Sequence, residues 1–226
     1  MKSYLIYFLR HGGTEAGKEG RYIGHTDVPL SAQGENQLRE MCEQYEYPQP
    51  DVVFSSPLKR CLQTAQIVYP DADVIPMRDL IEYNFGEFEN KTAQELEKHP
   101  VFPRWLAGEE GVDPPFGESS RDFQNRVCTA FIRIVEGLIK TGTTRAAIVT
   151  HGGVITTLLS TFGIPQASMH EWMMPEGCGY TVRITPMLWS GGQKMEVFEE
   201  IPIVPGKFSE EEDIFADFHV EDFLYD

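Results

Sequence analysis

Two apolar runs in this 226-residue chain each end in a histidine followed by glycine. Residues 4–9 lead into Arg10-His11-Gly12, and residues 145–150 lead into His151-Gly152-Gly153. Short apolar runs of this kind are typical of parallel strands that are buried on both faces. Because open α/β sheets bind ligands at the carboxyl ends of their strands, we expect both histidines and Arg10 to share one crevice.

The remaining apolar pattern alternates between strand and helix. Capping residues and 3.6-residue periodicity predict five helices. The first begins after Ser31, and the second has Ser56 as its N-cap and Pro57 at its first position. The other three are predicted at 93–98, from Ser119 or Ser120 to Gly142, and at 154–161. Further strands are predicted at 52–54, 74–75, 178–185 and 195–201, the last two as a hairpin that turns at Gly191-Gly192. The alternation predicts an α/β fold of three layers, α/β/α, with a mostly parallel central sheet and helices on both faces.

The chain length suits one domain, which we place at residues 1–205. Prolines and glycines break up residues 99–118, which we interpret as a lid or insertion beside the site. Residues 206–226 are acidic with interspersed aromatics, and we interpret them as a tail that docks its rings on the domain, with a partner subunit as the alternative. We expect a monomer or a homodimer.

Composition limits the partners. A net charge of −16 argues against nucleic acid, and it requires any phosphate site to be locally positive. The N-terminal apolar run is too short for a signal peptide or membrane span, so we expect a soluble, cytoplasmic protein without a membrane partner. The four cysteines, Cys42, Cys61, Cys128 and Cys178, are widely spaced, and none of them forms a pair that resembles zinc ligands. Three of them fall at helix-like apolar positions, as small core thiols would.

Arg10, His11, Arg60 and Glu82 suit phosphoryl chemistry. Arginine grips phosphate oxygens in a fixed fork, and a neutral imidazole nitrogen can attack phosphorus. Arg60 falls in the first turn of a predicted helix, where backbone N–H groups attract anions. Glu82 lies in an aromatic loop that would raise its pKa and suit it to protonate a leaving alcohol. Taken singly, each also has a structural interpretation: a strand-end staple for His11, a solvated charge for Arg60 and for Glu82.

A polar loop at 18–30 is predicted to form one wall of the crevice. It contributes Arg21 and His25 as candidate substrate contacts, and the backbone of Gly24 as a candidate phosphate contact. Tyr83 and Gly152, which adjoin Glu82 and His151, complete the predicted pocket.

These motifs together resemble the histidine phosphatase superfamily, in its phosphoglycerate-mutase-like branch, and among its members the α-ribazole phosphatases most. The resemblance covers residues 4–163, and more weakly extends to 204. Six blocks agree in order: Leu-Arg-His-Gly-x-Thr at 9–14, Gly-His-Thr-Asp-Val-Pro-Leu-Ser at 24–31, Ser-Ser-Pro-Leu-x-Arg at 55–60 with Gln-Thr-Ala at 63–65, Glu82 with Phe85-Gly86, Gly-Glu-Ser at 117–119, and Val-Thr-His-Gly-Gly at 149–153.

The resemblance implies a phosphatase that works through a phosphohistidine intermediate. His11 would be the nucleophile, and Arg10, Arg60 and His151 would bind the phosphoryl oxygens. Glu82 would protonate the leaving oxygen and then activate water. The partner would be a small phosphorylated substrate, and neither a cofactor nor a metal would be needed.

Departures from the family pattern leave alternatives open. Many relatives carry an acid and a phosphate-contacting asparagine where this chain has Gly13 and Gly17, and the usual Glu-Gly after the aromatic loop is Glu89-Asn90 here. The stretch 105–117 contains no lysine or arginine, which favours a monophosphatase over a phosphoglycerate mutase. A non-catalytic phospho-ligand sensor is another alternative, and a metal site made of His11, His25 and His151 is a poorer third.

Overall fold

The computed structural model describes residues 2–205, in which seven strands form one sheet in the order β3-β2-β4-β1-β6-β7-β5. β1 pairs in parallel with β4, and β4 and β3 pair in parallel with β2, whereas β6 runs antiparallel to β1 and β7. The prediction of a mostly parallel α/β sheet is therefore confirmed, and β6 is the antiparallel strand that makes the sheet mixed. Its strands are β1 (Tyr4–Arg10), β2 (Val52–Ser55), β3 (Val74–Pro76), β4 (Arg145–Thr150), β5 (Gly163–Ile164), β6 (Gly179–Ile184) and β7 (Met195–Ile201).

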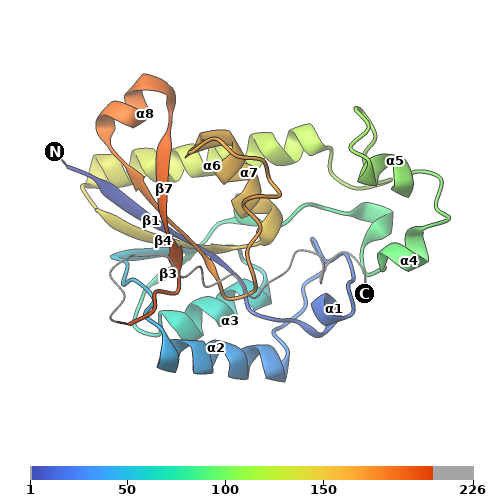
Figure 1. The fold of residues 1–226 in the computed structure, drawn as a ribbon, viewed down its shortest axis with the longest axis horizontal. Coiled ribbons are helices and arrows are strands. Elements are labelled where there is room, and N and C mark those ends of the chain that lie inside the picture. The colour runs from blue at the N-terminus through green and yellow to red at the C-terminus, as the bar shows by residue number, and fades with distance from the viewer. Residues whose placement is uncertain (1, 206–226) are drawn as a thin grey trace.

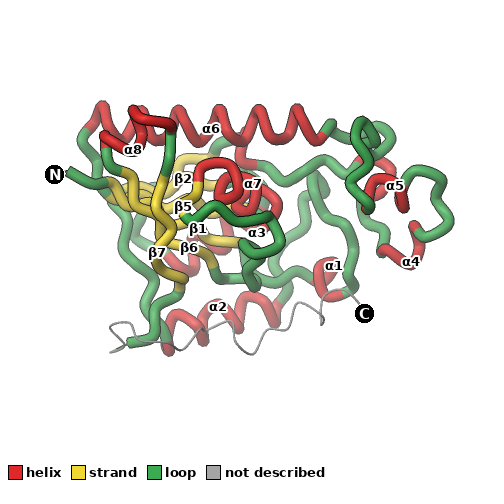
Figure 2. The backbone as a smooth tube through the Cα atoms, turned by 45° about the horizontal axis from the view of Figure 1, so that its top comes forward, coloured by secondary structure: helices red, strands yellow, loops and turns green. Residues whose placement is uncertain are grey.

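Helices cover both faces of the sheet (Figures 1 and 2). The chain forms α1 (Glu15–Lys18), α2 (Ala32–Gln44), α3 (Lys59–Val68), α4 (Ala93–Leu96), α5 (Phe102–Leu106), α6 (Ser120–Thr141), α7 (Gly152–Phe162) and α8 (Pro186–Gly192), with 3-10 turns at Arg78–Leu80 and Gly86–Phe88. α6 and α7 lie on one side of the sheet and α2 and α3 on the other, as Figure 1 shows. The predicted three layers are confirmed.

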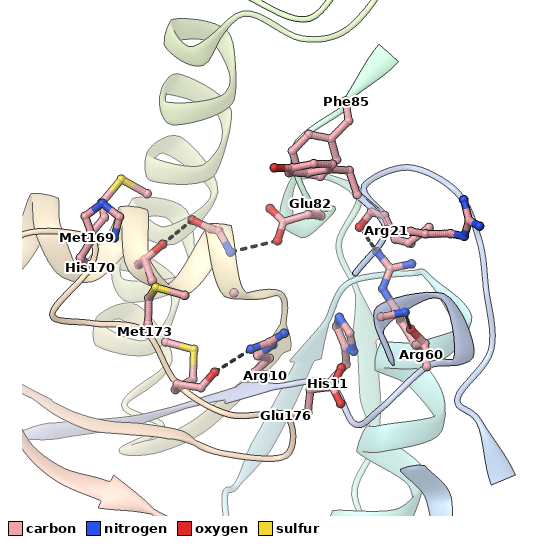
Figure 3. A pocket seen from close by; sticks show the side chains of 18 residues that line it. Arg10, His11, Arg21, Arg60, Glu82, Phe85, Met169, His170, Met173 and Glu176 are labelled. Carbon is pink, nitrogen blue, oxygen red and sulfur yellow. Dashed lines mark hydrogen bonds between the residues drawn. The ribbon is translucent and has the colours of Figure 1, made fainter. Parts of the chain in front are cut away.

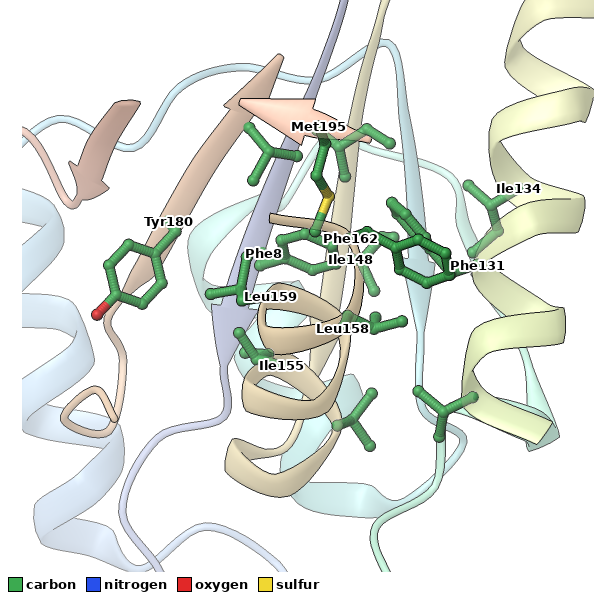
Figure 4. Packing of buried hydrophobic residues seen from close by; sticks show 14 of the residues in the cluster. Phe8, Phe131, Ile134, Ile148, Ile155, Leu158, Leu159, Phe162, Tyr180 and Met195 are labelled. Atoms are coloured by element: carbon green, nitrogen blue, oxygen red, sulfur yellow. The ribbon is translucent and has the colours of Figure 1, made fainter. Parts of the chain in front are cut away.

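Each face of the sheet has its own hydrophobic core. On the α6–α7 side, Phe8 and Ile148 of adjacent strands pack against Phe131, Leu158 and Phe162, and all but Phe162 are fully buried (Figure 4). On the α2–α3 side, Tyr7 and Leu9 alternate with Phe8 along β1 and meet residues of α2 and α3. The unbroken apolar run of β1 thus reflects burial on both faces, as the sequence pattern predicted.

Several predicted helix ends are confirmed. Ser31 accepts a hydrogen bond from Gly34 N at the start of α2, and Ser119 accepts one from Asp122 N at the start of α6. Thr92 forms the predicted capping box with Glu95, and Gly142 ends α6 in the left-handed conformation at φ 79°.

Three local predictions are wrong. Ser56 does not cap α3, which begins at Lys59 after Leu58, because its hydroxyl is used by a histidine described below. Gly191-Gly192 is not a hairpin turn: β6 and β7 do pair antiparallel, but α8 joins them, and the chain reverses at Gln193 with φ 51°. Cys42 is exposed rather than in the core, because it lies on the solvent side of α2.

Residues 99–118 contain α5, whose aromatic side chains pack against aromatic residues of the neighbouring loops. Trp105 contacts Tyr22 and Phe85 with ring centroids 5.6 and 6.0 Å apart. The acidic tail predicted at 206–226 lies outside the described residues. No helix within residues 2–205 is long and apolar enough to cross a membrane.

Candidate active site

His11 follows the last residue of β1 and is held with a defined tautomer. Its backbone N–H donates to Thr150 O of β4 (3.0 Å), and its ring Nδ1 lies 2.8 Å from Gly12 O. Because a carbonyl oxygen only accepts, Nδ1 carries the proton and Nε2 keeps its lone pair. Burial, reinforced by the nearby charges of Arg60 and Arg10, holds the pKa of His11 well below its usual 6.5. The ring is therefore neutral and suited to nucleophilic attack.

His151 lies at the end of β4, beside β1, and its ring meets that of His11 edge to face. The ring centroids are 5.2 Å apart. His151 Nε2 is 2.8 Å from the Ser56 hydroxyl, and the Cys61 thiol lies 3.5 Å from the same nitrogen. Burial and Arg60 also lower the pKa of His151 well below 6.5. The predicted meeting of the two histidines at one sheet edge is what the parallel pairing of β1 and β4 produces.

Two arginines are held beside the histidines by carbonyl groups rather than by carboxylates. Arg10 Nη1 donates to Met174 O (2.7 Å), and fully buried Arg60 donates to Thr26 O (2.9 Å) and Gly24 O (2.8 Å). Neither arginine forms an ion pair within residues 2–205, and the Nε–H group of each is buried without a partner. Unneutralised guanidinium groups with free donors form a site that attracts an anion.

Glu82 closes the opposite side of this cluster and is largely buried, with 8% of its surface exposed. Its carboxyl oxygens accept hydrogen bonds from Tyr83 N (2.8 Å) and Gly153 N (2.9 Å). Burial raises the pKa of Glu82, although both hydrogen bonds and the two arginines oppose the shift. A Cβ atom at position 153 would lie 2.5 Å from the carboxylate, so this close approach requires glycine.

Arg126 of α6 fixes the backbone that carries Glu82. Its guanidinium donates to the carbonyls of Ile81 (2.7 Å) and Glu82 (2.9 Å) and pairs with Glu118 at 2.6 Å. The loop that bears the candidate acid is therefore tied to the longest helix.

Glu89 fixes the loop at residues 24–26, which in turn holds Arg60. Its carboxylate accepts hydrogen bonds from the N–H groups of Gly24 (3.1 Å), His25 (2.8 Å) and Thr26 (3.3 Å), and from the Thr26 hydroxyl (2.6 Å). The carbonyls of Gly24 and Thr26 are the ones that hold Arg60. Glu89 thus organises the loop that orients the guanidinium.

Arg10, His11, Arg60 and Glu82 line a pocket of about 470 Å³ (Figure 3), whereas His151, which is buried beside His11, does not line it. Arg10 and His11 lie at its base, Glu82, Phe85 and Arg60 form one wall, and the segment around Met169 and Met173 forms the facing wall. The residues that line it are Arg10, His11, Thr14, Gly17, Arg21, Tyr22, Ile23, Arg60, Glu82, Phe85, Gly152, Gly153, Thr156, Met169, His170, Met173, Met174 and Glu176. The site is thus polar and cationic at its base and largely apolar above.

The predicted substrate contacts divide into two groups. Arg21 and Gly152 line the pocket, but Arg21 is paired with Glu19 (2.6 Å) and Glu95 (3.0 Å). His25 and Tyr83 do not line it: His25 is exposed, and Tyr83 packs edge to face against Phe123 in the core. Gly24 does not line the pocket either. Its backbone N–H, which was the predicted phosphate donor, donates to the Glu89 carboxylate instead.

Sequence reasoning missed the supporting residues and one wall of the pocket. Arg126 occupies an unremarkable position in the sequence, and Glu89 stands out there only as part of the departure Glu89-Asn90. Their bonds to backbone carbonyls and N–H groups reveal their roles. Met169, Met173 and Glu176 lie in an irregular segment between β5 and β6 whose sequence carries no motif. Within residues 2–205, no group of three or more histidine, cysteine, aspartate or glutamate side chains is arranged to hold a metal ion.

Comparison with known proteins agrees with this geometry. The family model described as histidine phosphatase superfamily (branch 1) matches residues 6–192. Phosphoglycerate mutase-like protein 4 of Arabidopsis thaliana is 34% identical over 160 residues, which cover 68% of either chain. An adenosylcobalamin/alpha-ribazole phosphatase of Salmonella typhimurium is 29% identical over 185 residues, covering 79% of this chain and 90% of that protein.

A solved structure shares the fold. The alpha-ribazole phosphatase from Shigella flexneri superposes with a TM-score of 0.74 at 24% identity, over 92% of this chain and all of that one. The family match and the similarity to the Salmonella phosphatase indicate an enzyme of the phosphatase or mutase type.

Proposed function

The chain belongs to the histidine phosphatase superfamily, and on that premise we propose that it is a phosphomonoester hydrolase that acts on a small phosphorylated metabolite through a phosphohistidine intermediate. One observation carries the proposal: a neutral histidine with a free Nε2 lies beside two arginines that are held by backbone carbonyls and form no ion pair within residues 2–205. This combination offers a nucleophile and an anion site within the same few ångströms.

The first half-reaction transfers the phosphoryl group to His11. Nε2 forms a bond to phosphorus while the bond from phosphorus to the ester oxygen breaks. Arg10, Arg60 and His151 stabilise the equatorial oxygens as charge redistributes. Each charge-assisted hydrogen bond contributes roughly 1.5–3 kcal/mol, so the local cluster outweighs the long-range repulsion from a net charge of −16.

Glu82 supplies the proton that the leaving oxygen needs. Burial raises the pKa of Glu82, which favours the proton-carrying form that a general acid needs, and its oxygens face the cluster from the wall opposite Arg10. After the alcohol departs, the Glu82 carboxylate takes a proton from water, and the resulting hydroxide oxygen attacks the phosphohistidine. Phosphate leaves, and both His11 and Glu82 return to their starting protonation states.

The distribution of positive charge favours hydrolysis over the mutase reaction. A bisphosphate needs a second cationic site, and the further arginine of the pocket, Arg21, is already paired with two carboxylates. Arg104, directly before the stretch 105–117 in which mutases would carry basic residues, is paired with Glu109. The walls above the phosphate site are apolar instead, which favours a substrate whose non-phosphate part is uncharged.

The test is phosphate release from a panel of esters, in the presence of EDTA. The panel includes p-nitrophenyl phosphate, 3-phosphoglycerate, phosphoserine and α-ribazole 5′-phosphate. We expect metal-independent release that His11→Ala abolishes, and a labelled phosphoenzyme after an alkaline quench. His99→Ala is the matched control, because His99 pairs with Glu87 away from the pocket.

Three results would contradict the proposal. Undiminished turnover by His11→Ala would show that His11 is not the nucleophile. A bisphosphate product in place of free phosphate would indicate the mutase. Tight phosphate binding without turnover of any ester would indicate a phospho-ligand sensor.

A further inference from the structure

Glu176 places a second carboxyl group in the pocket, at its base beside Arg10 and His11 (Figure 3). It precedes β6 in a segment that is fixed to the end of β1. Gly177 N lies within hydrogen-bond distance of Arg10 O (3.2 Å) and His11 O (3.3 Å), and Arg10 Nη1 donates to Met174 O. The position of Glu176 relative to His11 is therefore fixed by these hydrogen bonds between the segment before β6 and the end of β1.

The carboxyl group occupies space that two glycines leave open. A Cβ atom at Gly13 would lie 2.8 Å from Glu176 Oε2, and one at Gly17 would lie 3.2 Å from Oε1. Neither glycine contributes a side-chain donor to this wall, so the polar side chains that it presents to the pocket are Thr14, whose hydroxyl accepts a hydrogen bond from Gly17 N, and Glu176. Glu176 can take this position because both neighbouring residues are glycines.

Glu176 has no structural role that uses its carboxyl group. It makes no hydrogen bond to any residue within 2–205, although it is largely enclosed. A half-buried carboxyl group that lines a pocket and has no protein partner is expected to meet a ligand or water there. The carboxyl lies at the phosphate end of the pocket, below the apolar walls, so the ligand group that it meets is the phosphoryl group.

We propose that Glu176 binds the phosphoryl group as a neutral carboxylic acid, donating its O–H to a phosphoryl oxygen, and that ionisation of Glu176 weakens phosphate binding. The inference rests on the proposed function only in placing the phosphoryl group between Arg10, His11 and Arg60. A carboxylate could only accept hydrogen bonds and would repel the dianion, whereas the acid form adds a donor where Gly13 and Gly17 have no side chain to offer one.

The surroundings of Glu176 support the acid form. Burial raises the pKa of Glu176, and the positive charges of Arg10 and Lys18 only partly oppose this shift. A bound phosphoryl dianion would raise the pKa further. The titratable or charged groups that face Glu176 from the elements around it are Arg10 and His11 at the end of β1, Lys18 of α1, Glu40 of α2 and Cys178 before β6.

The test compares binding of inorganic phosphate by calorimetry at pH 5.5 and pH 8, for wild type, Glu176→Gln and Glu176→Ala. Because every variant meets the same mixture of phosphate ions, ratios of dissociation constants at one pH cancel the ionisation of phosphate itself. Glutamine keeps an N–H donor at every pH. Glu43→Gln, an exposed position on α2, is the control for the loss of one negative charge.

We expect Glu176→Gln to bind phosphate within about threefold of wild type at pH 5.5 and about tenfold more tightly at pH 8. Glu176→Ala, which offers no donor, should bind about tenfold more weakly than Glu176→Gln at both values. Glu43→Gln should follow wild type. Thermal melts at both pH values verify that each variant is folded.

Equal or weaker binding by Glu176→Gln at pH 8 would overturn the proposal, and so would a wild type that binds no phosphate. The outcome is separable from that of the proposed function. The predicted binding pattern without ester hydrolysis would support the Glu176 assignment and reject the hydrolase. Hydrolysis without the pattern would do the reverse.

Discussion

Glu89→Gln tests whether the loop at residues 24–26 holds Arg60 in its working position. In the wild type, Glu89 accepts hydrogen bonds from three consecutive backbone N–H groups and from the Thr26 hydroxyl. A glutamine side chain has only one acceptor oxygen, so its NH₂ group must face at least one of those N–H donors. In the mildest arrangement the Thr26 hydroxyl turns to accept from the amide, and Thr26 N–H is left unpaired.

The magnitude follows from these bonds. An unsatisfied backbone N–H costs about 1–3 kcal/mol, and the remaining bonds lose their charge assistance. Because Glu89 is only half-buried, water replaces part of this loss, and we expect unfolding to become about 2 kcal/mol easier. If Arg60 then loses half of a charge-assisted contact with the transition state, kcat/KM falls roughly 10-fold.

Glu87→Gln is the matched control, since Glu87 is exposed and lies two residues away. Steady-state kinetics on p-nitrophenyl phosphate and urea unfolding give both quantities. Reduced stability with unchanged kcat/KM would refute the link from Glu89 to Arg60, because the clamp would then hold only the loop. Unchanged stability would refute the hydrogen-bond argument itself.

Two further predictions concern the buried titratable groups. Glu82→Gln should lower kcat by roughly 10²–10⁴-fold on alkyl phosphates and by less on p-nitrophenyl phosphate, whose leaving group needs little protonation, and equal losses on both substrates would contradict its role as acid. Because the pKa of His11 is held below 6.5 in the folded protein, the unfolded chain takes up protons first as pH falls below about 6.5, and stability is lost in that range. Thermal melts from pH 7.5 to 5.5 in phosphate-free buffer should therefore decline less steeply for His11→Gln than for wild type, and parallel slopes would show that His11 is not a buried neutral group.

Local physical rules predicted the scaffold well. The apolar run of β1 and the caps at Ser31, Ser119 and Gly142 depend on interactions within a few residues, and each is confirmed. The failed prediction at Ser56 has the opposite origin. Its hydroxyl could cap α3, but His151, 95 positions away, is its partner instead, and no local pattern reveals a competing partner at that distance.

The same distinction explains the site. His11 and His151 were predictable as neighbours because each ends an apolar strand, and parallel pairing aligns those ends. Glu89 and Glu176 act through contacts whose sequence separation is large and whose partners are backbone groups or empty space beside glycine. A glutamate in an irregular segment carries no signal of such a role until the fold brings its partners together.

An anion site in a chain of net charge −16 depends on where the negative charges are kept. Arg21 and Arg104, at or beyond the rim, are each neutralised by glutamates, and so contribute little field at the base of the pocket. Arg10 and Arg60 are instead fixed by carbonyl oxygens, which orient a guanidinium without cancelling its charge. The two carboxyls that do enter the pocket, Glu82 and Glu176, have raised pKa values because they are buried. Because burial disfavours the charged form of both carboxyls, they oppose the charge of the two arginines less than exposed glutamates in the same place would.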